Sequence, residues 1–421
     1  MNKIKIESLN INGEGQCFVD GKKMCVNGVL PDEIVEVEIL QEKNNFMQGL
    51  SKNICTPSHL RICPECPYVG NCGGCDFMFV NSQRGLEIKK NIIKEYFKGL
   101  FSGEIVANAS PKSFEFRNKV AFAVLEDKIG LRKSNSHEIC EISNCIVANK
   151  NINIVLNIAK KWLKNAKNCQ ICHIVVRNIG EHVSICVVAR REFDYKILTD
   201  FIDTLKGSFG DKFGLFVSIN PSKNKILGKE CKHFYGEEKI PLERFGIKSF
   251  VRPLSFFQIN DEVALKMYSK VLEEISDNVV IEGYSGVGLL SCIMAKRAKE
   301  VFSIEIEKDA TKDANDAKKL NNLNNLHNIN GDCDVEMEKL LLRNKDATVV
   351  LDPPRMGVGK HTLDIILRTL PQKIVMISCN PYTLKQNIVF LSKNYEIKSF
   401  EIFDMFPQTF HIESLVVLKR K

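Results

Sequence analysis

A short stretch of the chain contains four closely spaced cysteines, Cys63, Cys66, Cys72 and Cys75. Thiolate sulfur is a soft ligand that suits zinc and iron–sulfur clusters. Two adjacent glycines before the last cysteine would let the backbone fold tightly around a metal and leave amides free to donate hydrogen bonds to sulfur. The spacing therefore predicts a metal centre. By itself it fits a zinc ion bound by all four cysteines as well as an iron–sulfur cluster.

Three further side chains could take part in covalent or acid–base chemistry. Asp352 and Cys379 each follow an apolar run, and Glu413 precedes the last one. A cysteine can act as a covalent nucleophile and a carboxylate as a general base. A single cysteine at the end of a strand is more often a core residue. The interpretation of Cys379 therefore depends on its combination with the two carboxylates.

A glycine-rich turn predicts a ligand pocket. The run Ile281–Gly288 follows an apolar stretch and precedes an expected helix, and Gly286 and Gly288 would let a ligand approach the backbone closely. Glu305 ends the next expected strand and could accept hydrogen bonds from both ribose hydroxyls of an adenosine. Asp332 follows a third strand and could accept from the adenine amine. A nicotinamide dinucleotide is an alternative ligand, although the full dinucleotide fingerprint is absent.

These residues require elements that bring strand ends together. From about residue 236 expected strands alternate with helices: strands at 279–281, 301–304, 349–351, 374–377 and 415–418, and helices at 289–299 and 308–320. Such alternation predicts a doubly wound α/β fold with a mostly parallel sheet that binds ligands at the carboxyl ends of its strands. Asp352 and Cys379 would then lie at the same edge.

The rest of the chain predicts two smaller units. Residues 1–55 alternate polar and apolar side chains between Asn12-Gly13, Asp20-Gly21 and Asn27-Gly28 turns, which predicts a small antiparallel β-barrel. Residues 56–235 contain the cysteines and mixed α+β signals, including strands at 119–124 and 174–176 and helices over 82–100 and about 150–166. The helix near 80–100 could instead pack on the third unit, residues 236–421.

The composition limits the classes of protein. At 421 residues two or three domains are expected, and the excess of 59 Lys and Arg over 51 Asp and Glu suits a polyanionic partner. The sequence contains neither a long apolar run nor a signal-peptide pattern, so we expect a cytoplasmic protein without a membrane span. In a reducing cytosol, clustered cysteines indicate metal binding or catalysis rather than disulfides.

Several motifs together resemble one family, the iron–sulfur RNA uracil-5 methyltransferases of the RlmD/RumA type. The N-terminal run resembles a TRAM domain, an RNA-binding barrel similar to the oligonucleotide-binding fold. The other matching segments are Cys66–Cys75 (Cys-x5-Cys-Gly-Gly-Cys), Ile142–Cys145, Ser255–Asn260 (Ser-Phe-Phe-Gln-Ile-Asn), Asp352–Arg355 (Asp-Pro-Pro-Arg), Ser378–Pro381 (Ser-Cys-Asn-Pro) and His411–Glu413. The resemblance covers nearly the whole chain.

The resemblance implies roles for individual residues. Cys379 would add to carbon-6 of uracil and Glu413 would remove the carbon-5 proton. It also implies a Rossmann-like methyltransferase domain, whose S-adenosylmethionine site would include Gln258, Tyr284, Gly286, Gly288, Glu305, Asp332 and Asp352. A 4Fe–4S cluster would be held by Cys66, Cys72, Cys75 and Cys145, with Cys140 as the alternative fourth ligand and Cys63 left over. The family usually has aspartate where Glu282 stands.

The implied substrate is 23S ribosomal RNA, because tRNA-specific relatives often lack both the barrel and the cluster. A tRNA uracil-5 methyltransferase, a zinc-stabilised amino methyltransferase and a non-catalytic RNA-binding protein are the alternatives. The Ser-Cys-Asn-Pro segment argues against an amino methyltransferase, which needs no nucleophilic cysteine. We expect a monomer with no obligate protein partner.

Overall fold

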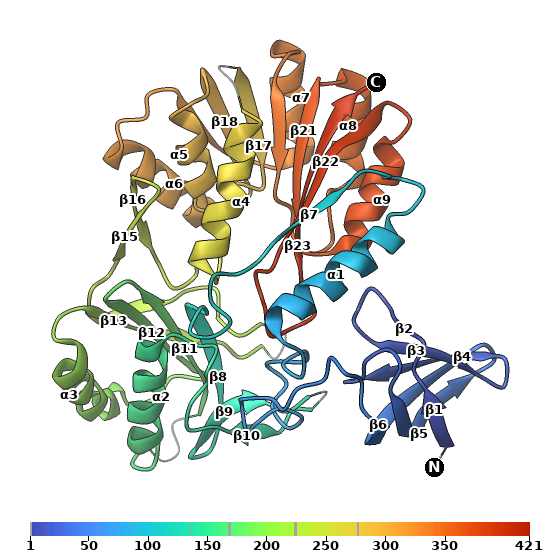
Figure 1. The fold of residues 1–421 in the computed structure, drawn as a ribbon. Helices are drawn as coiled ribbons and strands as arrows, with labels where there is room; N and C mark the ends of the chain where they lie inside the picture. Colours follow the sequence, from blue (N-terminus) through green and yellow to red (C-terminus); the bar gives the residue numbers. More distant parts are fainter. Residues whose placement is uncertain (1, 135, 167–169, 223–224, 276–277) are drawn as a thin grey trace.

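The computed structural model describes residues 2–134, 136–166, 170–222, 225–275 and 278–421. The chain forms three lobes, each built on its own sheet (Figure 1). Within the described residues, no helix combines the length and the apolar character needed to cross a membrane.

The N-terminal lobe is a six-stranded sheet in the order β1-β5-β6-β4-β3-β2. Its strands are β1 (Asn2–Lys5), β2 (Ser8–Leu9), β3 (Gly15–Val19), β4 (Lys22–Asn27), β5 (Ile34–Lys43) and β6 (Phe46–Thr56). Asp20 and Gly21 both have positive φ and form the expected tight turn between β3 and β4. The two edge strands are separated by only two residues of chain, so the sheet must curl strongly.

The expected all-antiparallel arrangement of this lobe is wrong in one respect. β4 and β6 pair in parallel, from Lys23 opposite Phe46 to Asn27 opposite Leu50. After β4 the chain forms β5, which is not a neighbour of β4, and then β6, which lies between β5 and β4 in the sheet. Alternating side chains predict that a strand has one buried face, but they do not predict which neighbour it pairs with.

The central lobe is a seven-stranded sheet in the order β10-β9-β8-β11-β12-β13-β14. Its elements are β8 (Lys119–Leu125), β9 (Lys128–Arg132), β10 (Ile139–Glu141), α2 (Lys150–Leu163), β11 (Ile171–Ile179), β12 (His182–Ala189), a 3-10 turn (Tyr195–Ile197), α3 (Leu198–Phe209), β13 (Phe213–Ile219) and β14 (Lys232–Gly236). Apolar side chains of α2 and α3 form a core against one face of the sheet, where Trp162 stacks on Phe201. The opposite face lines a cavity.

The C-terminal lobe contains the expected doubly wound sheet. Its order is β19-β18-β17-β20-β21-β23-β22-β7, parallel from β19 to β21, with β23 antiparallel to both of its neighbours. The strands are β7 (Ile105–Asn108), β17 (Val279–Gly283), β18 (Glu300–Glu305), β19 (Leu326–Asn330), β20 (Thr348–Leu351), β21 (Lys373–Ser378), β22 (Tyr395–Phe403) and β23 (Glu413–Arg420). A hairpin of β15 (Ile240–Arg244) and β16 (Ile247–Val251) precedes the lobe.

Helices cover both faces of this sheet. They are α4 (Asp261–Glu273), α5 (Leu289–Ala295), α6 (Lys308–Leu320), α7 (Cys333–Arg343), α8 (Lys360–Thr369) and α9 (Pro381–Leu391). Successive residues of a strand point into the apolar cores on opposite faces of the sheet. Val349 packs with α7 and α8, whereas Val350 packs with α4 and α5. Burial on both faces explains why these strands are continuous apolar runs.

A segment that precedes the central sheet completes the C-terminal lobe. Helix α1 (Ser82–Tyr96) packs on this lobe, where Phe97 makes an edge contact with Phe400, and β7 pairs in parallel with β22. The helix ends earlier than the periodicity over residues 82–100 predicts. Figure 1 shows α1 lying beside β7 and β23, between the N-terminal and C-terminal lobes.

Candidate active site

The glycine-rich turn follows β17 at the point where the order of strands reverses. Tyr284, Gly286 and Gly288 all have positive φ. The Gly286 amide donates to Glu305 Oε2 (2.8 Å), which joins the turn to the end of β18. A Cβ on Gly288 would lie 2.6 Å from the Cβ of Ala314 in α6, so this position requires glycine for helix packing as well as for its conformation.

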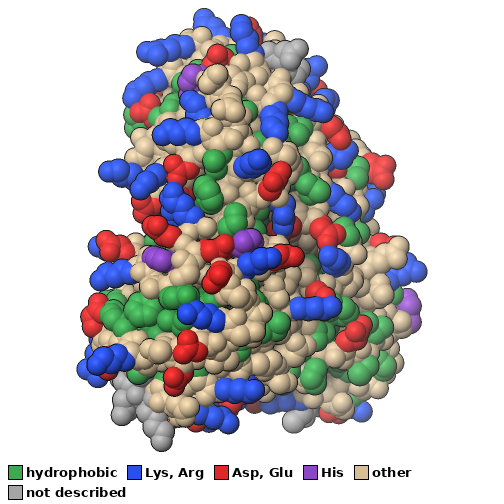
Figure 2. Space-filling view, turned by 90° about the vertical axis from the view of Figure 1, so that its left-hand side faces the viewer, with side chains coloured by type: hydrophobic (Ala, Val, Ile, Leu, Met, Phe, Trp, Pro, Cys, Tyr) green, Lys and Arg blue, Asp and Glu red, His purple; other side chains and the backbone are tan. Residues whose placement is uncertain are grey.

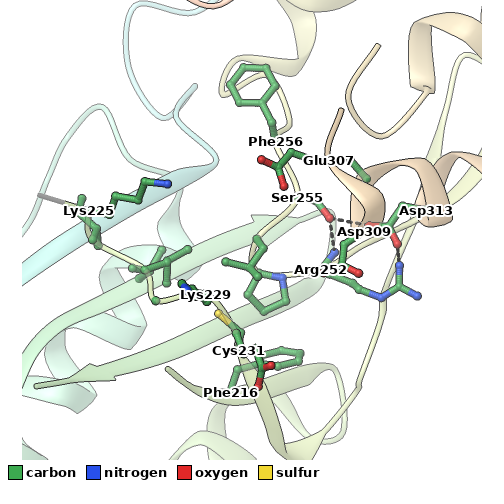
Figure 3. A pocket seen from close by; sticks show the side chains of 18 of the residues that line it. Phe216, Lys225, Lys229, Cys231, Arg252, Ser255, Phe256, Glu307, Asp309 and Asp313 are labelled. Carbon is green, nitrogen blue, oxygen red and sulfur yellow. Dashed lines mark hydrogen bonds and ion pairs between the residues drawn. The ribbon is translucent and has the colours of Figure 1, made fainter. Parts of the chain in front are cut away.

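Gly286 and Glu305 line a cavity of about 1050 Å³ between the C-terminal lobe and the open face of the central sheet. Figure 3 shows Lys225 and Lys229 across this cavity from Asp309 and Asp313. Two predicted cofactor residues make other contacts. Asp332 caps α7 by accepting from the Asp334 amide (2.9 Å), and the Tyr284 hydroxyl accepts from the Gly359 amide (3.5 Å).

Acidic side chains lie along one edge of the sheet, in β17 (Glu282), directly after β20 (Asp352) and at the start of β23 (Glu413). Burial raises the pKa of Glu282 to about 8 and that of Asp352 to about 7, although the Ser291 hydroxyl donates to Glu282. Burial and the charge of Asp352 raise the pKa of Glu413 well above its ordinary value, against the effect of Arg355. These carboxyls therefore tend to keep their protons near neutral pH in the ligand-free protein.

Cys379 lies directly after β21, at the same edge. Ser378 pairs with Ser414 across the β21–β23 ladder, and continuing this register places Cys379 opposite Glu413. Directly opposed side chains on neighbouring strands lie within contact range. Burial, and secondarily the charge of Glu413, raise the pKa of the Cys379 thiol to about 11, while Arg355 opposes the shift. The sheet thus places a thiol, a buried carboxyl and a guanidinium together.

The loops after β20 and β21 are tied to each other. Asn380 caps α9 by accepting from the Tyr382 amide, and its side-chain amide donates to the backbone oxygen of Arg355 (3.0 Å). Thr383 donates a second hydrogen bond to the same oxygen (3.3 Å). The Asp-Pro-Pro-Arg and Ser-Cys-Asn-Pro segments therefore form one loop pair.

Gln258 is held at the junction of the lobes. Asn118 of the central region donates to its backbone oxygen (2.9 Å), and Arg177 donates to the backbone oxygen of Ser255 (2.7 Å). The Gln258 side chain hydrogen-bonds the buried hydroxyl of Tyr268, whose pKa is raised by burial and by nearby carboxyls including Asp352. The sequence did not single out Tyr268, because its place in amphipathic α4 is typical of a core aromatic.

The segment that precedes Glu413 is anchored by a buried ion pair. Lys89 of α1 lies 2.7 Å from Asp404, and both side chains are at most 2% exposed. Its ammonium group also donates to the backbone oxygens of Phe406 and His411 (3.4 Å each). In the sequence Lys89 is one polar position of an amphipathic helix and accompanies the cysteine motif in the family resemblance, and neither signal predicts its anchoring role.

The predicted metal ligands line a second cavity, of about 240 Å³. Cys66, Cys72, Cys75 and Cys145 all contribute to its wall, whereas Cys63 is exposed and Cys140 is buried outside it. Among the described residues, however, no three histidine, cysteine or acidic side chains are placed to hold a single metal ion. The four predicted thiols therefore line one cavity, but they do not form the ligand geometry of a single metal ion.

The surroundings of these thiols bear on which group would fit. Burial raises the pKa of Cys75 to about 12 and also raises that of Cys145, while the charge of Arg117 opposes both shifts. The Gly74 amide donates to Cys72 Sγ (3.4 Å). A zinc ion needs four sulfurs about 2.3 Å from one centre, and the described thiols do not form such a group.

Comparison with known proteins, together with the fold, identifies an S-adenosylmethionine-dependent RNA methyltransferase. The tRNA (uracil-5-)-methyltransferase family model matches residues 81–421, and the chain belongs to this family. An uncharacterized RNA methyltransferase of Caldanaerobacter subterraneus is 32% identical over the full length of both chains, and one of Fusobacterium nucleatum is 30% identical over 100% of this chain and 96% of the relative.

The fold is also similar to a solved structure. The Pyrococcus abyssi tRNA (uracil-54, C5)-methyltransferase in complex with S-adenosyl-L-homocysteine matches with a TM-score of 0.79 and 24% identity, over 99% of this chain and 100% of that one. The likeness supports the three-lobe fold, including the N-terminal lobe that the family model leaves out.

Proposed function

We propose that this protein methylates carbon-5 of a uridine in 23S ribosomal RNA through a covalent adduct between Cys379 and the pyrimidine. The observation that carries the proposal is the placement of Cys379 opposite the buried Glu413, beside Asp352, at the carboxyl edge of the sheet. The glycine-rich turn lies at the same edge.

The chemistry requires each of these groups. Carbon-5 of uracil is a weak nucleophile, and addition of the Cys379 sulfur to carbon-6 converts the ring to an enolate that can accept a methyl group. Glu413 then removes the carbon-5 proton, the double bond reforms and the sulfur leaves. Asp352 would orient the uracil or complete the cofactor site.

The residues fit the methyl donor, which would supply its methyl group from a sulfonium cation. Glu282, Asp352 and Glu413 are buried acids with raised pKa values, and Arg355 is the charge that opposes the pKa shifts of Glu413 and Cys379. A cation bound among them would favour their ionised forms and that of the thiol. Gly286 and Glu305 would hold the adenosine end.

Two variants test the covalent step with 5-fluorouridine-containing RNA and unmodified RNA. Cys379→Ala should form no adduct and lose turnover by at least about 1,000-fold, while it still binds the cofactor. Glu413→Gln should form adduct on unmodified RNA and release it slowly, because the proton on carbon-5 stays in place. Denaturing gels and mass spectrometry report both results. Robust methylation by Cys379→Ala would refute the proposal.

RNA would lie in the large cavity. Lys119, Lys225, Lys229 and Lys232 supply positive charge from the central lobe, and Phe256 projects 68% exposed from the segment that holds Gln258. Lysines can bind phosphates, and an exposed aromatic ring can stack on a base. On the face drawn in Figure 2, basic and acidic side chains are interspersed. The N-terminal lobe would add contacts as a TRAM domain.

A tRNA substrate is the second candidate. The Pyrococcus structure resembles this chain over its whole length, and that protein is a tRNA (uracil-54, C5)-methyltransferase. The N-terminal lobe therefore does not separate the two substrates. Mapping 5-methyluridine in ribosomal and transfer RNA from a strain that lacks this protein separates them directly, since only the true substrate loses the modification.

We also propose that Cys66, Cys72, Cys75 and Cys145 hold a 4Fe–4S cluster, whose iron would stabilise the buried thiolates and join residues 66–75 to residue 145. Protein purified without oxygen should be brown and should contain about four iron atoms per chain. Cys145→Ser should lose most of this iron, whereas Cys63→Ser should keep it. Stoichiometric zinc in place of iron would contradict the assignment.

A further inference from the structure

The open face of the central sheet carries a pair of thiols that belong neither to the proposed catalytic residues nor to the proposed cluster ligands. Cys186 lies in β12 and Cys231 directly precedes β14, and their Sγ atoms are 3.6 Å apart. Cys186 is only 1% exposed, whereas Cys231 is half-buried and lines the large cavity (Figure 3). One sulfur is therefore shielded and the other can be reached from solvent.

The surroundings favour a reactive Cys231. The Cys186 thiol, the Ser218 hydroxyl and the Lys119 ammonium lower the pKa of Cys231, against the effect of burial. The same interaction with Cys231, together with burial, raises the pKa of Cys186. Lys119 is the cation next to this pair, and burial, together with the charge of Arg177 opposite it in the β8–β11 ladder, lowers its own pKa to about 8. Reactive cysteines typically occupy such electropositive, partly exposed positions.

We propose that Cys186 and Cys231 are a redox-reversible dithiol that is oxidised by a peroxide. The Cys231 thiolate attacks one oxygen of hydrogen peroxide, which gives a sulfenic acid and releases hydroxide. The Cys186 thiol then attacks the Cys231 sulfur, so that the disulfide forms and water leaves. The sulfurs need to approach by only about 1.5 Å to reach bonding distance, and an external dithiol restores the pair.

The disulfide would link the segment of residues 225–232, which forms one wall of the cavity, to β12. Leu227 and Cys231 pack on the apolar face formed by β11, β12 and β13, and residues 225–232 supply three of the cavity's lysines. A covalent link from Cys231 to β12 would restrict local opening of this segment. We therefore expect slower amide exchange over residues 225–233 in the oxidised protein.

The test uses the full chain, reduced without oxygen, treated with one equivalent of hydrogen peroxide, alkylated and digested. Mass spectrometry should find a Cys186–Cys231 linked peptide that dithiothreitol removes. Cys172→Ser, a change in the same apolar cluster, should still form the link. Cys231→Ser should leave Cys186 open to alkylation after denaturation.

Two results would overturn the inference. One is oxidation of Cys231 to sulfinic acid in the wild-type chain while Cys186 stays alkylatable. The other is a link confined to the cysteines of the metal site. Unchanged amide exchange over residues 225–233 after complete disulfide formation would contradict the fastening of the wall. None of these readouts depends on RNA or on methyl transfer.

Discussion

Several residues of the active site carry buried acidic groups that would destabilise the ligand-free protein if they were ionised. Glu282 is 1% exposed, hydrogen-bonded to Ser291 and close to the charge of Asp352. A buried acid is tolerated because it stays protonated, and it becomes useful when a cation arrives. The same reasoning explains why Cys379, Asp352 and Glu413 are all shifted toward their neutral forms.

This arrangement predicts a pH-dependent stability. The pKa values of Glu282 (about 8) and Asp352 (about 7) are raised, so the folded chain holds these protons more firmly than the unfolded chain does. Their contribution to the free energy of unfolding is complete below about pH 4, the unfolded pKa range, and is lost as the pH rises through 7 to 8. Glu282→Gln keeps a partner for Ser291 and cannot ionise. It should reduce the loss of stability between pH 6 and pH 9 by about 2–3 kcal/mol, because about two pH units of this range lie below the folded pKa of about 8.

Urea unfolding without cofactor at the two pH values measures this difference. Glu396→Gln, at an exposed position of β22, is the matched control and should leave the pH dependence unchanged. Equal loss of stability in wild type and Glu282→Gln would show that Glu282 is not the group responsible.

At the scale of elements, one helix holds the segment that ends at Glu413. The Lys89 ammonium joins α1 to Asp404 at the end of β22 and to two carbonyls further along. Additional hydrogen bonds hold the same segment, from the Phe410 amide to Asp76 (2.9 Å) and from the Phe77 amide to the backbone oxygen of Gln408 (3.1 Å). The proposed base therefore depends on α1, which lies far from it in the sequence.

Breaking the ion pair should reveal this dependence. Lys89→Met leaves the Asp404 carboxylate buried without its partner and should lower the free energy of unfolding by about 3–5 kcal/mol. The double variant Lys89→Met/Asp404→Leu removes both charges and should recover most of that loss. Urea unfolding at pH 7 gives both values. A double variant as unstable as the single one would mean that Lys89 acts through packing alone.

At the scale of the whole molecule, the N-terminal lobe docks beside the active-site segment. A Cβ on Gly13 would lie 2.3 Å from the ring of Phe410, and Phe410 makes an edge contact with Phe77 (5.0 Å between centroids). Leu9 and Leu30 of the lobe share an apolar cluster with these rings. The barrel-like lobe is therefore packed against the same segment that α1 anchors.

Gly13→Ala tests this docking. Gly13 and Gly21 have similar positive φ, but a Cβ on Gly21 meets open space. Gly21→Ala should therefore lose only about 1–2 kcal/mol from backbone strain, whereas Gly13→Ala adds a clash of about 1–3 kcal/mol. Hydrogen exchange over residues 404–412 should rise in Gly13→Ala only. Equal exchange in both variants would argue against docking through Phe410.

The sequence by itself determined those features of the protein that depend on local residue chemistry and on the spacing of apolar residues along the chain. Alternating strands and helices predicted the doubly wound sheet, and the strand-end positions of Asp352 and Cys379 follow from that alternation. Tertiary structure alone decided which distant side chains meet: Lys89 with Asp404, Gln258 with Tyr268, Cys186 with Cys231, and the parallel pairing of β4 with β6. Periodicity reports which face of an element is buried, but the partner on that face is set by sheet order and register, which arise only when the whole chain packs.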